Sequence, residues 1–258
     1  MSTPTQIPVG QPTEAVQPGL SESQRIINTF VAPSKTFLDI RRNANWWVPW
    51  LLSTLAIMAF FYTVEKKVGY EAIVTNRMAH ASFMQKMTAQ LPPEKKQEMI
   101  DKQVQSSHRQ MYTAPIFTLI GSAIFAALLL GTFNFLFAAE VTYKQSLAIL
   151  FYGTLPKILS AALAILVMFI GVEPDGFDVE SPVATNLGAL LGSNTDSRAL
   201  YHLLGGIDLF SVWWVALVGI GFAVVSKKKI STSTAIGAVA AWYVVGILLR
   251  VAMVPFAG

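Results

Sequence analysis

Long uncharged apolar runs alternate with short polar segments along this chain. A helix rises 1.5 Å per residue, so about 20 apolar residues cross a hydrocarbon core of roughly 30 Å. The pattern therefore predicts an all-α fold, a polytopic transmembrane helical bundle. The five expected spans cover residues of about 46–64, 115–139, 145–172, 209–226 and 230–254.

The chain before the first span has two parts. Residues 1–20 hold four prolines and few large apolar side chains, which predicts a disordered tail. Residues 21–45 mix Phe30, Phe37 and Ile40 with basic residues. This mixture predicts amphipathic helices that lie at the membrane surface, apolar side down. A soluble linker is the alternative.

The remaining residues, 46–258, form the predicted membrane domain, with two polar insertions. Residues 65–112 are rich in charge and are divided near Pro92, so we expect a polar helical hairpin between spans one and two. Residues 173–208 are acidic and predict an extramembrane or re-entrant loop.

Composition supports membrane insertion. The chain is 53% hydrophobic and 13% charged, whereas about a quarter of the residues in soluble domains are charged. No cysteine is present, which excludes disulfides and cysteine-ligated metal sites. The net charge of +4 comes from basic residues beside the spans, so it indicates membrane lipids as partners and no nucleic acid.

An odd number of spans puts the two termini on opposite sides of the membrane. Arg41, Arg42, Lys144 and Lys227–Lys229 would share the side of the N-terminus. Basic residues in short loops favour the cytoplasm, so we predict the N-terminus inside and the C-terminus outside. The basic residues of the polar hairpin argue the other way.

Two features of the spans predict specific contacts. Span two carries small residues that allow close helix approach, either to another membrane protein or to a second copy of the chain. These residues are Gly121, Ser122, Ala126, Ala127 and Gly131. Asp208 and Arg250 lie at span ends on the same predicted side, where they form a candidate interfacial ion pair. Independent helix capping by Asp208 and snorkelling by Arg250 is the alternative.

One charge lies well inside a span. Lys157 follows Pro156 and is thirteen residues beyond Lys144, or about 20 Å along a helix. A lysine there costs roughly 2.5–3.5 kcal/mol unless it is paired. We predict an intramembrane polar site built from Lys157, Tyr152 and Asn134 beside the Pro156 kink, able to bind an anionic headgroup or ion. The alternative is a structural lysine that satisfies the kink.

Patterns typical of enzymes are missing from the sequence. The three histidines lack a second ligand at metal spacing, and there is no phosphate loop or nucleophile motif. We therefore expect no catalytic residue, no metal and no cofactor.

Three segments resemble the Yip family, bacterial branch, whose eukaryotic members are named for interacting with Ypt and Rab GTPases. They are FVAPSKTF at 30–37 with WWVPW at 46–50, VTYK at 141–144 with FYGTLP at 151–156, and IDLFSVW at 207–213. The resemblance implies a polytopic bundle in the bacterial inner membrane, associated with membrane organisation and needing no cofactor. The aspartate-leucine-tyrosine-glycine-proline signature of the eukaryotic members is absent, which makes small-GTPase binding doubtful.

These observations predict a membrane scaffold or interaction protein, involved in membrane organisation or trafficking-like processes. Its expected binding surfaces are the amphipathic segment and the polar hairpin. The alternative is a small transporter or permease subunit with Lys157 in its pathway.

Overall fold

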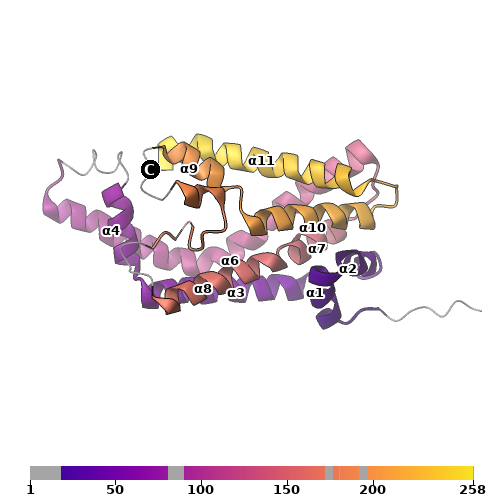
Figure 1. The fold of residues 1–258 in the computed structure, drawn as a ribbon, viewed down its shortest axis with the longest axis horizontal. Helices are drawn as coiled ribbons and strands as arrows, with labels where there is room; N and C mark the ends of the chain where they lie inside the picture. Colours follow the sequence, from indigo (N-terminus) through magenta and orange to yellow (C-terminus); the bar gives the residue numbers. More distant parts are fainter. Residues whose placement is uncertain (1–18, 81–89, 172–176, 180, 192–196, 258) are drawn as a thin grey trace, which may run out of the picture.

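The computed structural model describes residues 19–80, 90–171, 177–179, 181–191 and 197–257. The described residues form helices and contain no β-strand, so the predicted all-α class is confirmed. The expected tail at 1–20 lies almost wholly outside this range. The long helices run side by side along the longest axis of the molecule (Figure 1).

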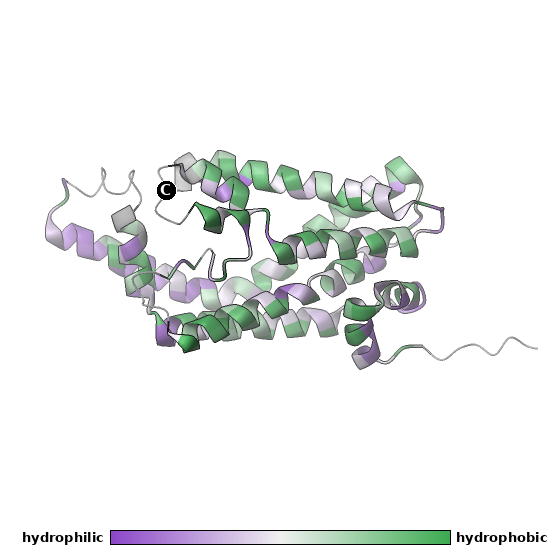
Figure 2. Ribbon diagram, in the orientation of Figure 1, coloured by the Kyte–Doolittle hydropathy of each residue, from purple (hydrophilic) through white to green (hydrophobic). Residues whose placement is uncertain are grey.

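Four helical stretches are long and apolar enough to cross a membrane. They are α3 (Trp47–Lys67), α6 (Pro93–Phe137), α7 with α8 (Tyr143–Ile170) and α11 (Thr232–Ala257) up to Met253. A fifth apolar helix, α10 (Leu209–Val225), has 17 residues. Figure 2 shows the apolar character of these helices against the more polar α4 end.

The polar hairpin and the second predicted span share one helix. A short helix, α4 (Tyr70–His80), follows the turn at Gly69, and its Val74 and Met78 pack on Ile100 of α6. Helix α6 itself begins at Pro93 and continues for 45 residues with Pro115 inside it. The polarity of the chain therefore changes near residue 112 without ending the helix.

The third apolar run is divided into two helices. Helix α7 (Tyr143–Gly153) begins at a capping box made by Thr142 and Gln145, and α8 (Leu155–Ile170) follows after Thr154. Pro156 lies in the first turn of α8, where its missing amide hydrogen costs least. Helix α7 is enclosed from Ser146 to Gly153, so the centre of the core is near its axis.

The N-terminal amphipathic helices pack on the bundle. They are α1 (Glu22–Val31), which starts at a capping box of Ser21 and Gln24, and α2 (Pro33–Ile40). Phe37 and Ile40, which the sequence pattern placed against lipid, are fully buried. The structure differs from the prediction because the apolar face of α2 has a protein partner, chiefly α10.

Glycines allow the closest helix approach in α10 rather than in span two. A Cβ on Gly219 would lie 2.6 Å from Cα of Ile236 in α11, and one on Gly221 would lie 2.5 Å from Ile149 in α7. A Cβ on Gly121 in α6 would meet no atom within 4 Å. Of the predicted small residues, Ala126 is fully buried, and its carbonyl accepts a hydrogen bond from Ser146 of α7.

Candidate functional site

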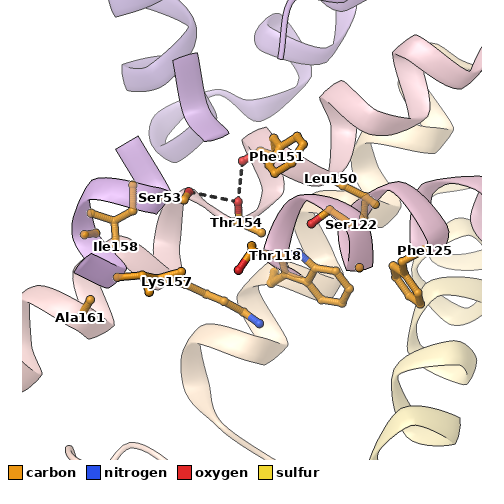
Figure 3. A pocket seen from close by; sticks show the side chains of 14 residues that line it. Ser53, Thr118, Ser122, Phe125, Leu150, Phe151, Thr154, Lys157, Ile158 and Ala161 are labelled. Carbon is orange, nitrogen blue, oxygen red and sulfur yellow. Dashed lines mark hydrogen bonds between the residues drawn. The ribbon is translucent and has the colours of Figure 1, made fainter. Parts of the chain in front are cut away.

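A pocket opens inside the bundle where α3, α6, α7, α8 and α10 meet (Figure 3). Its volume is about 330 Å³, within the range of small-molecule sites. Fourteen residues form its walls: Ser53, Ala56, Ile57, Thr118, Gly121, Ser122, Phe125, Leu150, Phe151, Thr154, Lys157, Ile158, Ala161 and Trp214. The predicted lysine is therefore at a cavity, within a largely apolar lining.

The Lys157 ammonium lies over the indole of Trp214, with Nζ 5.2 Å from the ring centroid. This cation–π contact holds the side chain in the pocket without pairing its charge. Trp214 is 8% exposed, and its buried Nε1 has no hydrogen-bond partner among the described residues. The pocket thus contains a cation that makes no ion pair with a described residue.

Hydroxyl groups line the pocket on two other helices. On α3, the Ser53 hydroxyl donates to the Pro49 carbonyl at 2.8 Å and lies 3.4 Å from the Thr154 hydroxyl. On α6, Thr118 and Ser122 are one turn apart and therefore share a face. Gly121 adds no side chain between them, which leaves the space that the pocket occupies.

The structure does not bring together the predicted site residues. Tyr152 is fully buried and donates to Glu22 at 2.6 Å, away from the pocket lining. Asn134 exchanges two 2.9 Å hydrogen bonds with the backbone of Val141, which fixes the turn between α6 and α7. The predicted site is thus reduced to Lys157, with partners that the sequence did not indicate.

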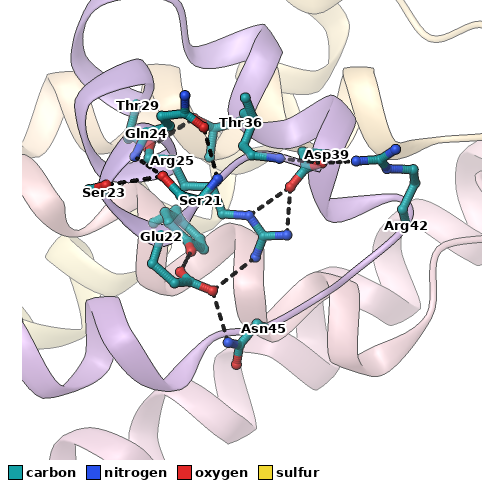
Figure 4. A network of polar contacts seen from close by, with 12 residues as sticks. Ser21, Glu22, Ser23, Gln24, Arg25, Thr29, Thr36, Asp39, Arg42 and Asn45 are labelled. Atoms are coloured by element: carbon teal, nitrogen blue, oxygen red, sulfur yellow. Dashed lines mark hydrogen bonds and ion pairs between the residues drawn. The ribbon is translucent and has the colours of Figure 1, made fainter. Parts of the chain in front are cut away.

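A second polar cluster, the N-terminal network, joins α1 and α2 (Figure 4). Arg25 is 2% exposed, and its Nε donates to the Asp39 carboxylate at 2.7 Å. Arg42 donates to the other oxygen of Asp39 at 2.7 Å. The carbonyl of Arg25 also accepts from the hydroxyls of Thr29 and Thr36, each at 2.8 Å. The two helices therefore form one unit.

Glu22 connects this unit to the membrane domain. Its carboxylate accepts from Arg25 at 3.3 Å, from Asn45 at 2.9 Å and from the Tyr152 hydroxyl of α7 at 2.6 Å. Helices α1 and α2 are thereby tied to the buried core helix.

Asp39 stays ionised within the N-terminal network. Burial alone would raise its pKa, but hydrogen bonds from Arg42 and Arg25 outweigh this and hold the pKa below its usual value. Sequence reasoning missed Glu22 and Asp39. The available signal was the position of Asp39 three residues after Thr36 and next to Ile40, which puts a charge on the apolar face of α2.

Asp208 caps helix α10, which is the alternative that the sequence left open. Its carboxylate accepts from the backbone N–H of Ser211 at 2.9 Å and from the Thr185 hydroxyl at 2.6 Å. Arg250 is exposed on α11. An ion pair between Asp208 and Arg250 remains a prediction.

The chemistry of the pocket suits ligand binding, whereas that of the N-terminal network suits fixing α1 and α2 to the bundle. The pocket offers one cation and several donors, and the N-terminal network is saturated by internal bonds. Within the described residues, His, Asp and Glu form no group of three that could hold a metal ion.

Comparison with known proteins adds the family. No curated protein and no solved structure matches the chain. The family model described as the Yip1 domain matches residues 27–253, a range that includes α2, the pocket and the long helices, with α11 up to Met253. The chain therefore belongs to the Yip family of membrane proteins.

Proposed function

We propose that this protein is an integral membrane scaffold that binds other membrane proteins in membrane organisation or a trafficking-like process, and that it catalyses no reaction. Membership of the Yip family supports the membrane setting. The observation that carries the proposal is the pair α1–α2, which is fixed to the bundle yet exposes apolar side chains.

We call this surface the N-terminal platform and define it by Ile27, Val31 and Leu38. Their exposed fractions are 61%, 73% and 55%. Ile27 and Val31 lie one turn apart on α1 and so share a face. A shared exposed apolar face of this kind marks a protein–protein or a membrane interaction site.

The platform is rigid because charged groups behind it are buried and paired. The Arg25–Asp39 pair and the Tyr152–Glu22 hydrogen bond fix α1 relative to α2 and α7. A surface that is ordered before binding loses less conformational entropy when a partner docks. This rigidity favours a role in protein binding over a loose membrane anchor.

The proposed orientation puts the platform in the cytoplasm. Helices α1 and α2 lie at the same end of the molecule as the α10–α11 turn, which carries Lys227–Lys229 (Figure 1). Arg41 donates to the Ser226 carbonyl at 3.0 Å, which ties the two segments together. Basic residues gathered at one end support a cytoplasmic N-terminus by the positive-inside rule.

The test compares proteins recovered with the full-length chain from its native membrane in lipid nanodiscs. The variant carries Ile27→Ser and Val31→Ser, and the matched control carries Leu200→Ser and Leu203→Ser, an exposed apolar pair on α9 (Arg198–Gly205) outside both the platform and the polar hairpin. Exposed substitutions change stability little, so both should fold.

We expect a stoichiometric protein partner with the wild type and the control but not with the platform variant. Recovery of the same partner with all three proteins, or of none with the wild type, would contradict the proposed function. Transport through the pocket remains a prediction from the sequence.

A further inference from the structure

Hydrogen-bond donors in the Lys157 pocket have no acceptor. The Lys157 ammonium lies over the face of Trp214 and makes no hydrogen bond or ion pair with a described residue. The hydroxyls of Thr118 and Ser122 also make no hydrogen bond within the part of the chain that the structure describes. A bound acceptor would give the ammonium and these hydroxyls the partner that they lack.

No lining residue of the pocket is acidic. Asp208 is close enough to act electrostatically on Lys157, but its carboxylate already accepts from Ser211 and Thr185. Asp208 thus caps α10, and it makes no ion pair with the Lys157 ammonium among the described residues. A ligand that carries its own negatively charged oxygen would satisfy the ammonium.

The apolar part of the lining restricts the kind of anion. Ile57, Phe125, Ile158 and Ala161 form the walls beside the polar groups. A small inorganic anion would lose its hydration against these side chains without compensation. An amphiphile would place its acidic group on the donors and its hydrocarbon chain on the walls.

The site also lies where amphiphiles are available. Lys157 is in α8 and Trp214 is in α10, both apolar helices of the membrane domain. Lys157 is an exposed residue of an apolar helix and lines the cavity. An amphiphile in the bilayer would therefore meet this part of the bundle directly.

We propose that this pocket binds an anionic amphiphile whose carboxylate or phosphate accepts from Lys157 Nζ. The hydroxyls of Thr118 and Ser122 complete the head-group site, and the acyl chain lies along the wall made by Ile158 and neighbouring residues. The inference concerns a different surface from the N-terminal platform and does not depend on it.

The experiment titrates the purified full-length protein with three probes and counts bound molecules by native mass spectrometry. The probes are oleate, dioleoyl phosphatidylglycerol and dioleoyl phosphatidylcholine. Oleate and phosphatidylglycerol have negatively charged head groups, with one and two acyl chains respectively. Phosphatidylcholine is zwitterionic. Comparing phosphatidylglycerol with phosphatidylcholine tests whether the head-group charge is needed. Comparing oleate with phosphatidylglycerol tests whether the anion is a fatty acid or a phospholipid.

Two variants change the pocket in different ways. Lys157→Met removes the charge, and its matched control is Lys144→Met, an exposed lysine on α7 outside the pocket. Gly121→Leu fills the cavity but keeps Lys157. A Cβ at Gly121 meets nothing within 4 Å, and leucine favours helix, so this variant should unfold at no lower temperature than the wild type.

We expect one oleate or one phosphatidylglycerol per wild-type chain. Lys157→Met should lower the affinity about tenfold or more, the scale of one charge-assisted hydrogen bond. Gly121→Leu should lower the affinity by a similar factor because its side chain occupies the cavity. Lys144→Met should bind as the wild type does. Tighter binding of oleate would identify a single-chain ligand, and tighter binding of phosphatidylglycerol a phospholipid. Equal binding of phosphatidylcholine, or equal affinity in the folded Gly121→Leu variant, would overturn the proposal.

Discussion

Removing the carboxylate of Asp39 should release α1 from the bundle. Arg25 and Asp39 have side chains that are 2% and 6% exposed, so the remaining arginine would be left buried. Breaking a buried ion pair by removing one partner costs about 3–5 kcal/mol. Glu22 still lies 3.3 Å from Arg25, so we expect the lower end for Asp39→Ala, about 3 kcal/mol or roughly a hundredfold in the local opening constant.

Hydrogen exchange of the α1 amides measures this opening directly. The matched control is Lys227→Ala, which breaks the 3.2 Å ion pair with Glu140 at the same end of the molecule. That pair is 68% and 53% exposed, and exposed pairs contribute about 0–1 kcal/mol. If exchange over residues 22–31 were equally fast in both variants, the inferred role of the buried pair would be refuted.

Three further predictions concern Asp39, Gly219 and Tyr152. The pKa of Asp39 is lower in the folded than in the unfolded protein. The Asp39 carboxylate therefore contributes its full stabilisation of the fold above the unfolded pKa of about 3.9. This contribution is lost as the pH falls through the lower folded value. Hydrogen exchange of α1 should therefore be constant from pH 8 to about 5 after correction for intrinsic rates, and should accelerate only below about pH 4. In thermal unfolding, Gly219→Ala should destabilise by about 1–3 kcal/mol because its Cβ meets Ile236, whereas Gly237→Ala, with open space, should not. Tyr152→Phe should weaken α1 docking by about 1.5–3 kcal/mol in the same exchange assay, through loss of a charged hydrogen bond.

Hydropathy predicted the long apolar helices but not where α6 begins. The predicted span starts near residue 115, whereas the helix starts at Pro93. The charged residues of the hairpin stop near Tyr112, and this change marks a change of environment. Helix α6 continues through it, because backbone hydrogen bonds on both sides of Pro115 maintain the helix. Hydropathy reports the surroundings of a residue, whereas helix continuity depends on the backbone.

The sequence identified Lys157 because a single charge in an apolar run is locally visible. Its partners could not be identified in this way, since Trp214, Thr118 and Ser122 come from helices distant in the sequence. Tyr152 was assigned to the same site, yet it lies in α7 before the break at Thr154, whereas Lys157 lies in α8. Tyr152 faces Glu22 instead.

Glycine spacing was also insufficient to predict close packing. Gly121 in span two was expected at a helix contact, but it borders the pocket, while Gly219 in α10 makes the close approach to α11. Both occur in apolar helices, and only the fold decides which of them faces a neighbour.

Crosslinking from the N-terminal platform tests the proposed scaffold most directly. A photoreactive residue is placed at Val31, 73% exposed, in the full-length protein in its native membrane, and a second at exposed Leu200 on α9 is the control. We predict a discrete protein adduct from position 31, absent from position 200 and reduced by Asp39→Ala. Adducts to lipid alone from position 31 would contradict the platform as a protein-binding surface.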